Sequence, residues 1–259
     1  MPEGDTVYRT ARTLDRALHG EVLTGCDIRV PEFATVQLAG ETMHDVASRG
    51  KHLLMRVGEA SIHSHLKMEG SWHLYRRATR WRRPAFQARA VLETADWVAV
   101  GFELGLLEVI PRAAEADLLS YLGPDLLAAD WDADEAVRRI LTSPERPVAV
   151  SLADQGNLAG LGNVYVNELC FLRGLLPTRP VGEVADVPAL VSLAHRLILA
   201  NRDRSERTTT GDTRRGAQSW VFSRGGQACR RCGTRIERGR LGRNELELRN
   251  TFWCPHCQT

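Results

Sequence analysis

The apolar and polar positions of the chain change their period twice. Residues 6–19 repeat apolar side chains at the spacing of one helix face, at Val7, Ala11, Leu14 and Leu18. We expect a helix there, with Asp5 or Thr6 as its cap and Gly20 at its end.

Six short runs rich in β-branched and apolar residues come next, separated by glycine, proline and charged turns. They are residues 21–30, 52–57, 60–66, 86–93, 96–102 and 106–110. This pattern predicts an antiparallel β-sandwich. After Pro111 the period becomes helical again. We expect helices over residues 114–121, 133–142, 148–155, 163–173 and 187–201.

The pattern therefore predicts an α+β protein in three parts. An N-terminal antiparallel β-sandwich, flanked by the first helix, is expected over residues 1–112. A helical domain is expected over residues 113–225, and a small ribbon over residues 226–259. The ribbon is rich in glycine and arginine and holds too few apolar residues for a core of its own.

Composition and the length of the apolar runs indicate the class of protein and its compartment. The chain is 25% charged and 43% apolar, as in an ordinary soluble protein. The opening MPEGDTVYRT lacks the basic-then-apolar pattern of a signal peptide, and no run approaches 18 apolar residues. We expect a protein without membrane spans, in the cytoplasm or nucleoid.

The net charge of +2 conceals an uneven distribution. From Arg202 to Arg249 there are 13 arginines and six acidic residues, which leaves this stretch near +7. A basic block on a nearly neutral chain indicates a polyanionic partner, although a solvated arginine-rich surface explains the charge equally well.

Four cysteines of the ribbon have the spacing of a metal site. Cys229 and Cys232 form one Cys-x2-Cys pair, Cys254 and Cys257 form another, and 21 residues separate the pairs. Four thiolates suit one structural tetrahedral Zn²⁺, and they leave no position for a catalytic water. A structural zinc contributes on the order of 10–16 kcal/mol in isolated fingers, enough to fold a segment that has almost no core.

Two further segments have features of phosphate binding. Gly160 and Gly162 precede Asn163, which we expect to cap the helix that follows, and helix starts bind anions. In the ribbon, Arg249 lies near aromatic residues and suits contact with a phosphate. Each feature also has a plainer explanation, as a helix-packing turn and as a surface arginine.

Together these motifs resemble the formamidopyrimidine-DNA glycosylase/endonuclease VIII family. The resemblance is carried by the N-terminal Pro-Glu-Gly, the Gly-Leu-Gly-Asn turn and the Arg-x-Thr-Phe-x-Cys ribbon, and it runs from residue 2 to residue 258. It implies a β-sandwich, a helix-two-turn-helix domain, a zinc ribbon and damaged DNA as the partner, duplex and also single-stranded. We expect a monomer.

The resemblance also implies roles for individual residues. Pro2, exposed once Met1 is removed, matches the family's nucleophile, and Glu3 matches its catalytic acid. Lys51 in SRGKHLL matches a strand lysine that contacts DNA and assists the chemistry. The remaining positions implied to contact DNA are Lys67, Met68, Asn163 and Arg249.

The family's two branches are not equally similar to the chain. LGPDLL, LAGLGN and WCPHCQ are similar to the endonuclease VIII branch, of the actinobacterial type, which acts mainly on oxidised pyrimidines. HLKMEG, at residues 65–70, instead looks like the oxidised-purine branch, but the Arg-Phe pair of that branch is not apparent between residues 100 and 110.

The expected chemistry is base excision followed by strand cleavage. An amine at C1′ forms an imine, which permits β,δ-elimination. An α-amino group has a pKa of roughly 7.7–8.0, so much more of it is neutral at pH 7 than of a lysine. Met68 is expected to fill the gap that the flipped base leaves, although a core methionine is the alternative.

Two other functions stay open at this point. One is an oxidised-purine (8-oxoguanine or formamidopyrimidine) glycosylase of the same family. The other is a nucleic-acid-binding protein without catalysis, which would use the helical turn and the ribbon alone.

Overall fold

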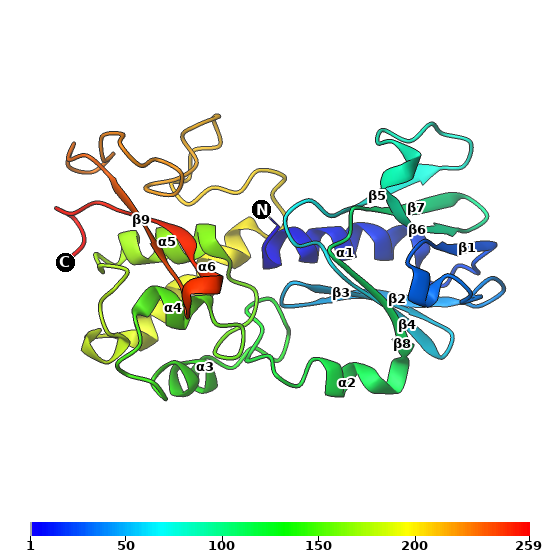
Figure 1. Ribbon diagram of the computed structural model, residues 1–259, viewed down its shortest axis with the longest axis horizontal. Coiled ribbons are helices and arrows are strands. Elements are labelled where there is room, and N and C mark those ends of the chain that lie inside the picture. Colours follow the sequence, from blue (N-terminus) through cyan, green and yellow to red (C-terminus); the bar gives the residue numbers. More distant parts are fainter. Residues whose placement is uncertain (1) are drawn as a thin grey trace. The chain divides into compact units, whose positions relative to one another are not determined.

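A computed structural model describes residues 2–259 of the chain. The chain forms two compact units, one ending at Ser120 and one beginning at Tyr121. Strands dominate the first unit and helices the second (Figure 1). The finer division into three domains stays a prediction.

The expected N-terminal helix is present, and it begins earlier than expected. Helix α1 spans Gly4–Leu18 and buries the four apolar residues of its predicted stripe. Glu3 is its N-cap, so the expectation of a cap at Asp5 or Thr6 is wrong. The chain leaves the helix through Gly20, whose φ of 77° is the left-handed conformation that glycine adopts easily.

The antiparallel β-sandwich is confirmed. One sheet has the order β1-β6-β7-β5 and the other the order β2-β3-β4-β8. Their bounds are β1 Gly25–Ile28, β2 Met43–Arg49, β3 His52–Val57, β4 Ala60–His65, β5 Ser71–Arg76, β6 Ala88–Glu93, β7 Trp97–Phe102 and β8 Leu106–Pro111. All six predicted runs contain a strand, whereas β2 and β5 were not predicted.

Helix α1 covers an edge of this sandwich. Its apolar stripe packs into the same core as residues from both sheets. The Val46 amide of edge strand β2 donates to the Asp15 carboxylate at 2.8 Å, and the Gly20 amide donates to the Met43 carbonyl at 2.8 Å. Strand β2 therefore runs back along α1 towards the start of the helix, and the helix protects the edge from pairing with another strand.

The second unit is a group of helices with a two-stranded ribbon. Its helices are α3 Ala133–Ile140, α4 Val148–Ala153, α5 Asn163–Leu172 and α6 Val187–Asn201, close to the predicted ranges. Helix α2, Glu115–Leu118, precedes them in the first unit. Strands β9, Glu237–Leu241, and β10, Arg249–Trp253, pair antiparallel in the ribbon.

Short 3₁₀ turns complete the secondary structure. They are η1 Pro31–Phe33, η2 Ala85–Gln87, η3 Arg112–Ala114, η4 Val181–Glu183 and η5 Glu245–Glu247. The helices of the second unit enclose a core of their own around the fully buried Tyr165. Within residues 2–259, no helix has both the length and the apolar character needed to cross a membrane.

Candidate functional site

The start of helix α1 places two of the expected catalytic residues next to each other. Pro2 is half-buried, and Glu3 has a relative exposure of 0%. The Glu3 carbonyl accepts hydrogen bonds from the amides of Thr6 at 2.9 Å and Val7 at 3.0 Å, so the helix begins directly after it. The partial positive charge of a helix N-terminus disfavours an ammonium group there. A buried carboxyl group beside an amine suits proton transfer.

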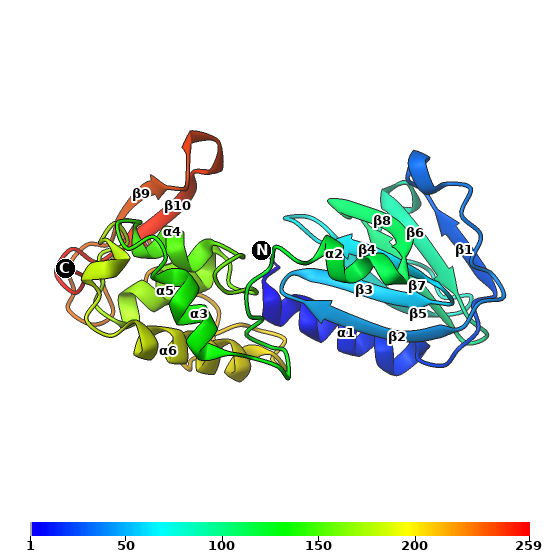
Figure 2. The ribbon, with the colours of Figure 1, turned by 90° about the horizontal axis from the view of Figure 1, so that it is seen from below.

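Lys51 lies in the two-residue turn between β2 and β3. Arg49 pairs with His52 across this turn, and Gly50 has the left-handed φ of 58°. Helix α1 has 15 residues and strand β2 has 7, so each is about 20 Å long. Because β2 runs back along α1, the turn lies at the same end of this unit as the start of the helix (Figure 2).

Lys67 and Met68 lie in the turn between β4 and β5. His52 pairs with His65, so this turn is at the same end of its sheet as Lys51. Lys67 has a φ of 51°, and Met68 is 61% exposed. The alternative of a core methionine is therefore wrong, and the role of Met68 as a wedge stays a prediction.

A buried chain of histidines lies next to these lysines. His52 Nδ1 is 2.8 Å from His63 Nε2, and His63 Nδ1 is 3.0 Å from a Glu108 carboxylate oxygen. Burial, followed by the charges of His63, His65, Lys67 and Lys51, lowers the pKa of His52 to about 3. Burial, followed by the same two lysines, lowers the pKa of His65 to about 4.

In the second unit, the glycine-rich turn leads into α5 as expected, but a different residue is the cap. Helix α5 begins at Asn163 with Gly162 as its N-cap, so the expectation that Asn163 caps the helix is wrong. Gly160 takes the left-handed φ of 112° that a tight approach to the helix requires. The Asn163 side-chain amide donates to the Asn250 carbonyl at 2.8 Å, which ties the turn to β10.

Arg249 is the first residue of β10 and is exposed. It lies next to Asn250, the residue that Asn163 holds, and pairs with Leu241 of β9. Asn163 and Arg249 both line a hollow of about 410 Å³. The structure therefore brings together the two phosphate-binding candidates of this unit, although 85 residues of chain lie between them.

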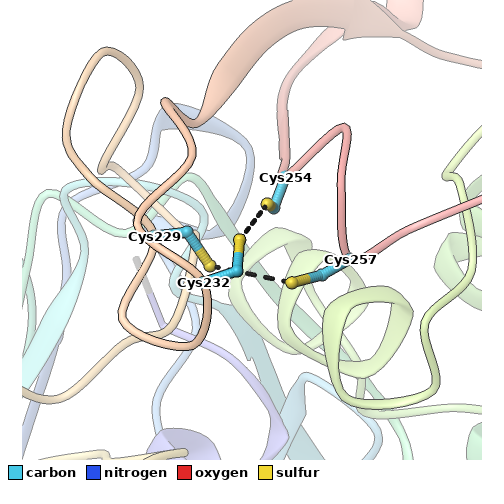
Figure 3. A group of neighbouring side chains, drawn as sticks. All are labelled: Cys229, Cys232, Cys254 and Cys257. Carbon is cyan, nitrogen blue, oxygen red and sulfur yellow. Dashed lines mark hydrogen bonds between the residues drawn. The ribbon is translucent and has the colours of Figure 1, made fainter.

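The four ribbon cysteines form one cluster, and their side chains point toward one another (Figure 3). All four sulfurs lie within 4.8 Å of one another, with Cys229 and Cys257 4.0 Å apart and Cys232 and Cys254 3.5 Å apart. Zinc–sulfur bonds of about 2.3 Å in a tetrahedron place the sulfurs about 3.8 Å apart, so this cluster fits a zinc ion.

The two remaining cysteines lie apart from this cluster and do not share its chemistry. Cys170 is fully buried, and burial raises its pKa to about 12. Cys26 is half-buried, and burial also raises its pKa. Both are thiols at neutral pH.

The sequence did not reveal two polar residues of α5 that hold the ribbon. The buried Glu168 carboxylate accepts hydrogen bonds from three successive amides, of Trp220 at 2.7 Å, Val221 at 2.9 Å and Phe222 at 2.8 Å. The neighbouring Asn167 side chain accepts from the Phe252 amide at 2.6 Å. Two adjacent polar residues in the middle of a mainly apolar helix were the signal that these positions had a special role.

Comparison with known proteins gives consistent matches. Residues 1–103 match the model of the formamidopyrimidine-DNA glycosylase N-terminal domain. The chain is 52% identical to the DNA-(apurinic or apyrimidinic site) lyase Nei2 of Mycolicibacterium smegmatis, covering 100% of this chain and 99% of that protein. It is also 52% identical to Endonuclease 8 2 of Mycobacterium bovis, with both chains fully covered.

A solved structure supports the fold. The chain resembles Lactococcus lactis Fpg, determined in complex with DNA containing an abasic site, with a TM-score of 0.83 and 22% identity. The alignment covers 100% of both chains. At this identity the likeness concerns the arrangement of the backbone.

Proposed function

The chain belongs to the formamidopyrimidine-DNA glycosylase and endonuclease 8 family, and from this membership we propose that it excises oxidised bases through an imine on Pro2. It is a DNA glycosylase and AP lyase of base excision repair, and it binds damaged DNA. Oxidised pyrimidines are its favoured substrates. The proposal includes one structural zinc ion on the four ribbon cysteines and a monomer that works in the cytoplasm or nucleoid.

The burial of Glu3 is the observation that carries this proposal. The Glu3 side chain has 0% exposure, so its carboxyl group is shielded from water. Here it directly follows the one residue whose nitrogen becomes a secondary amine when Met1 is removed. The turn that bears Lys51 lies at the same end of the sandwich.

The reaction follows from these groups. The damaged nucleotide leaves the stack, since its C1′ is out of reach inside a duplex. The Pro2 nitrogen forms a bond to C1′ as the bond from C1′ to the base breaks. The base leaves with the electron pair of that bond and takes up the proton that the nitrogen loses. Glu3 then protonates O4′ as the sugar ring opens, which leaves a positively charged C1′=N iminium.

Strand cleavage uses the same intermediate. The iminium acidifies the proton on C2′, and Glu3, which became a carboxylate when it protonated O4′, accepts this proton. The electron pair of the C2′–H bond then forms a C2′=C3′ double bond as the 3′ phosphate leaves. A second elimination expels the 5′ phosphate, so the gap carries phosphate at both ends. Water then hydrolyses the C=N bond and restores the amine of Pro2. Lys51 contributes positive charge close to the departing phosphates.

Borohydride trapping tests this proposal, because borohydride reduces an imine to a stable bond between protein and DNA. The full chain is incubated with borohydride and labelled duplexes that contain an abasic site, an oxidised pyrimidine or 8-oxoguanine. We expect a larger yield of cross-linked complex with the abasic-site and oxidised-pyrimidine duplexes than with the 8-oxoguanine duplex. Peptide mapping is expected to find the link at Pro2.

Two control proteins and three contrary outcomes separate the parts of the proposal. An uncleaved N-terminal extension is expected to abolish the cross-link, whereas Lys51→Ala should lower its yield and leave it at Pro2. Attachment at a lysine would refute the role of Pro2. A higher yield on 8-oxoguanine would reverse the substrate preference. A protein that binds the duplexes but never cross-links would be the non-catalytic alternative.

A further inference from the structure

The segment from Arg76 to Arg89 is strongly basic and lies outside the site described above. Its sequence, RRATRWRRPAFQAR, holds six arginines and no acidic residue. It connects β5 to β6, which lie on either side of β7 and are both antiparallel to it. The segment must therefore run back along the sheet to reach the start of β6.

Aromatic packing and hydrogen bonds hold this segment against the sheet. The Trp81 ring meets the Phe102 ring edge-on, with centroids 5.9 Å apart and planes at 83°. The Arg82 amide donates to the Tyr75 hydroxyl at 3.1 Å. Arg83 donates to the Ser71 hydroxyl at 3.1 Å and pairs with the carboxylate of Glu103, in the turn between β7 and β8. These contacts anchor the backbone of the segment, so its exposed side chains extend from a fixed backbone.

Five of the six arginines of this segment fall into two groups, and the sixth, Arg89, donates to the Phe86 carbonyl at 3.2 Å. Arg76, Arg77 and Arg83 each have a carboxylate partner in the sandwich, at Asp96, Glu93 and Glu103. Arg80 and Arg82 are exposed, and across residues 2–259 neither has a carboxylate within 4.0 Å. Two neighbouring guanidinium groups are therefore presented to solvent without a counter-charge from the protein.

An aromatic ring accompanies these two arginines. Phe86 is 79% exposed, and residues 79–85 border an open hollow of about 600 Å³. One exposed apolar side chain is ordinary on a protein surface. An exposed ring four and six residues along the chain from two unpaired arginines has the character of a single-strand binding surface, in which cations hold the backbone and aromatic rings stack on bases.

We propose that this segment is a second DNA-contact surface, which holds single-stranded DNA. Arg80 and Arg82 bind backbone phosphates, and Phe86 stacks on an unpaired base. Bases within a duplex are already stacked on each other, so an exposed ring gains most from an unpaired one. The inference rests on the proposed function for its choice of DNA as the polyanion. An acidic protein surface would match the arginines but not the ring.

Salt-dependent binding of the full chain tests this surface. Fluorescence anisotropy is measured with a 20-nucleotide oligothymidine and with an undamaged duplex of the same length. Each of Arg80→Ala and Arg82→Ala should flatten the log–log salt dependence on the single strand by about 0.7. Phe86→Leu keeps the apolar bulk and loses the ring, so it should weaken single-strand binding about fivefold or more with the slope unchanged.

A matched control is Arg16→Ala, which removes another exposed arginine of the same unit, in the last turn of α1. It should leave both slopes unchanged. Thermal melting of each variant confirms that it folds. Unchanged slopes in the Arg80 and Arg82 variants would overturn the proposal. The proposal would also be overturned if the Arg80 and Arg82 variants lost as much binding to polyglutamate as to single-stranded DNA. That result would show a surface that binds any polyanion.

Borohydride trapping distinguishes failure of this inference from failure of the proposed function. Wild-type protein is also trapped with borohydride on abasic-site duplex. If trapping fails while the Arg80, Arg82 and Phe86 variants lose single-strand binding, the surface stands and the enzymatic proposal falls. If trapping succeeds and these variants bind as the wild type does, only the surface is refuted.

Discussion

Nδ1 of His52 and Nε2 of His63 share one hydrogen bond across 2.8 Å. The direction of this hydrogen bond follows from the other nitrogen of the His63 ring. Nδ1 of His63 faces the Glu108 carboxylate at 3.0 Å and must carry a proton. When His63 is neutral its ring has only this one N–H, so its Nε2 is the acceptor and Nδ1 of His52 is the donor. Glu108 therefore sets the tautomer of His52, although the two side chains lie on different strands.

The stability of the first unit is expected to fall in acid because of this arrangement. The unfolded chain protonates His52 near pH 6.5, whereas the folded chain does so only near pH 3. Between these values the unfolded state binds more protons, so stability is complete above pH 6.5 and declines as the pH falls toward 3. His65, with a pKa of about 4 in the folded chain, acts in the same direction.

Urea unfolding followed at pH 7.5, 6 and 5 measures this effect. The wild type should lose on the order of a few kcal/mol across the range, and His52→Gln should lose clearly less. His44→Gln changes an exposed histidine of β2 and serves as the control. Equal pH dependence in the wild type and the His52 variant would show that another group is responsible.

Removal of the metal is expected to affect only the C-terminal part of the chain. Elemental analysis should find one zinc per chain on the four cysteines, because their sulfurs already lie within 4.8 Å of one another. Chelation should increase amide exchange across residues 226–259 and weaken DNA binding, while the sandwich keeps its protection. A metal-free protein that is folded in the ribbon and binds DNA normally would contradict the zinc assignment.

Arg249→Ala should weaken DNA binding to the same extent for every sequence. A phosphate contact releases condensed counterions, so its loss should flatten the log–log salt slope on duplex DNA by about one. Arg138→Ala, on the exposed face of α3 and paired with Glu135, is the control and should leave the slope unchanged. If both variants gave the wild-type slope, Arg249 would not be a phosphate ligand.

Met68→Ala should slow excision from duplex DNA by about tenfold or more and spare single-stranded substrates. An unpaired base leaves no gap in a stack, whereas opening a duplex step costs a few kcal/mol that an inserted side chain offsets in part. Met68→Leu keeps the apolar volume and should retain most of the activity. Single-turnover rates on both substrates measure the difference, and equal losses on the two would exclude the wedge.

The sequence predicted most elements of the fold because their apolar positions recur with a clear period. The exceptions are β2 and β5, which are both edge strands. In β2 only Met43 and Val46 are buried, and a bulge shifts the register between Met43 and Asp45, so the alternation is lost. In β5 only Trp72 and Tyr75 are buried, three residues apart.

The site could be predicted where it depends on local spacing. The four cysteines were recognisable as a set because each pair is a short motif, and Asn163 and Arg249 because their neighbours in sequence are distinctive. The link from His63 to Glu108 could not be recognised in the sequence. These residues are 45 positions apart and meet only through the register of β4 with β8. Periodicity along one chain carries no information on such a register.

The hydrogen bonds that the Asn167 and Glu168 side chains accept limit how the ribbon can be exchanged between proteins. One residue holds the last strand of the ribbon through Phe252, and the other holds the segment that leads into it through residues 220–222. The ribbon is therefore not a portable module defined by its cysteines. A chimera that receives a foreign ribbon must also inherit this dipeptide from the donor's helix, or the graft will bind its metal and still be misaligned.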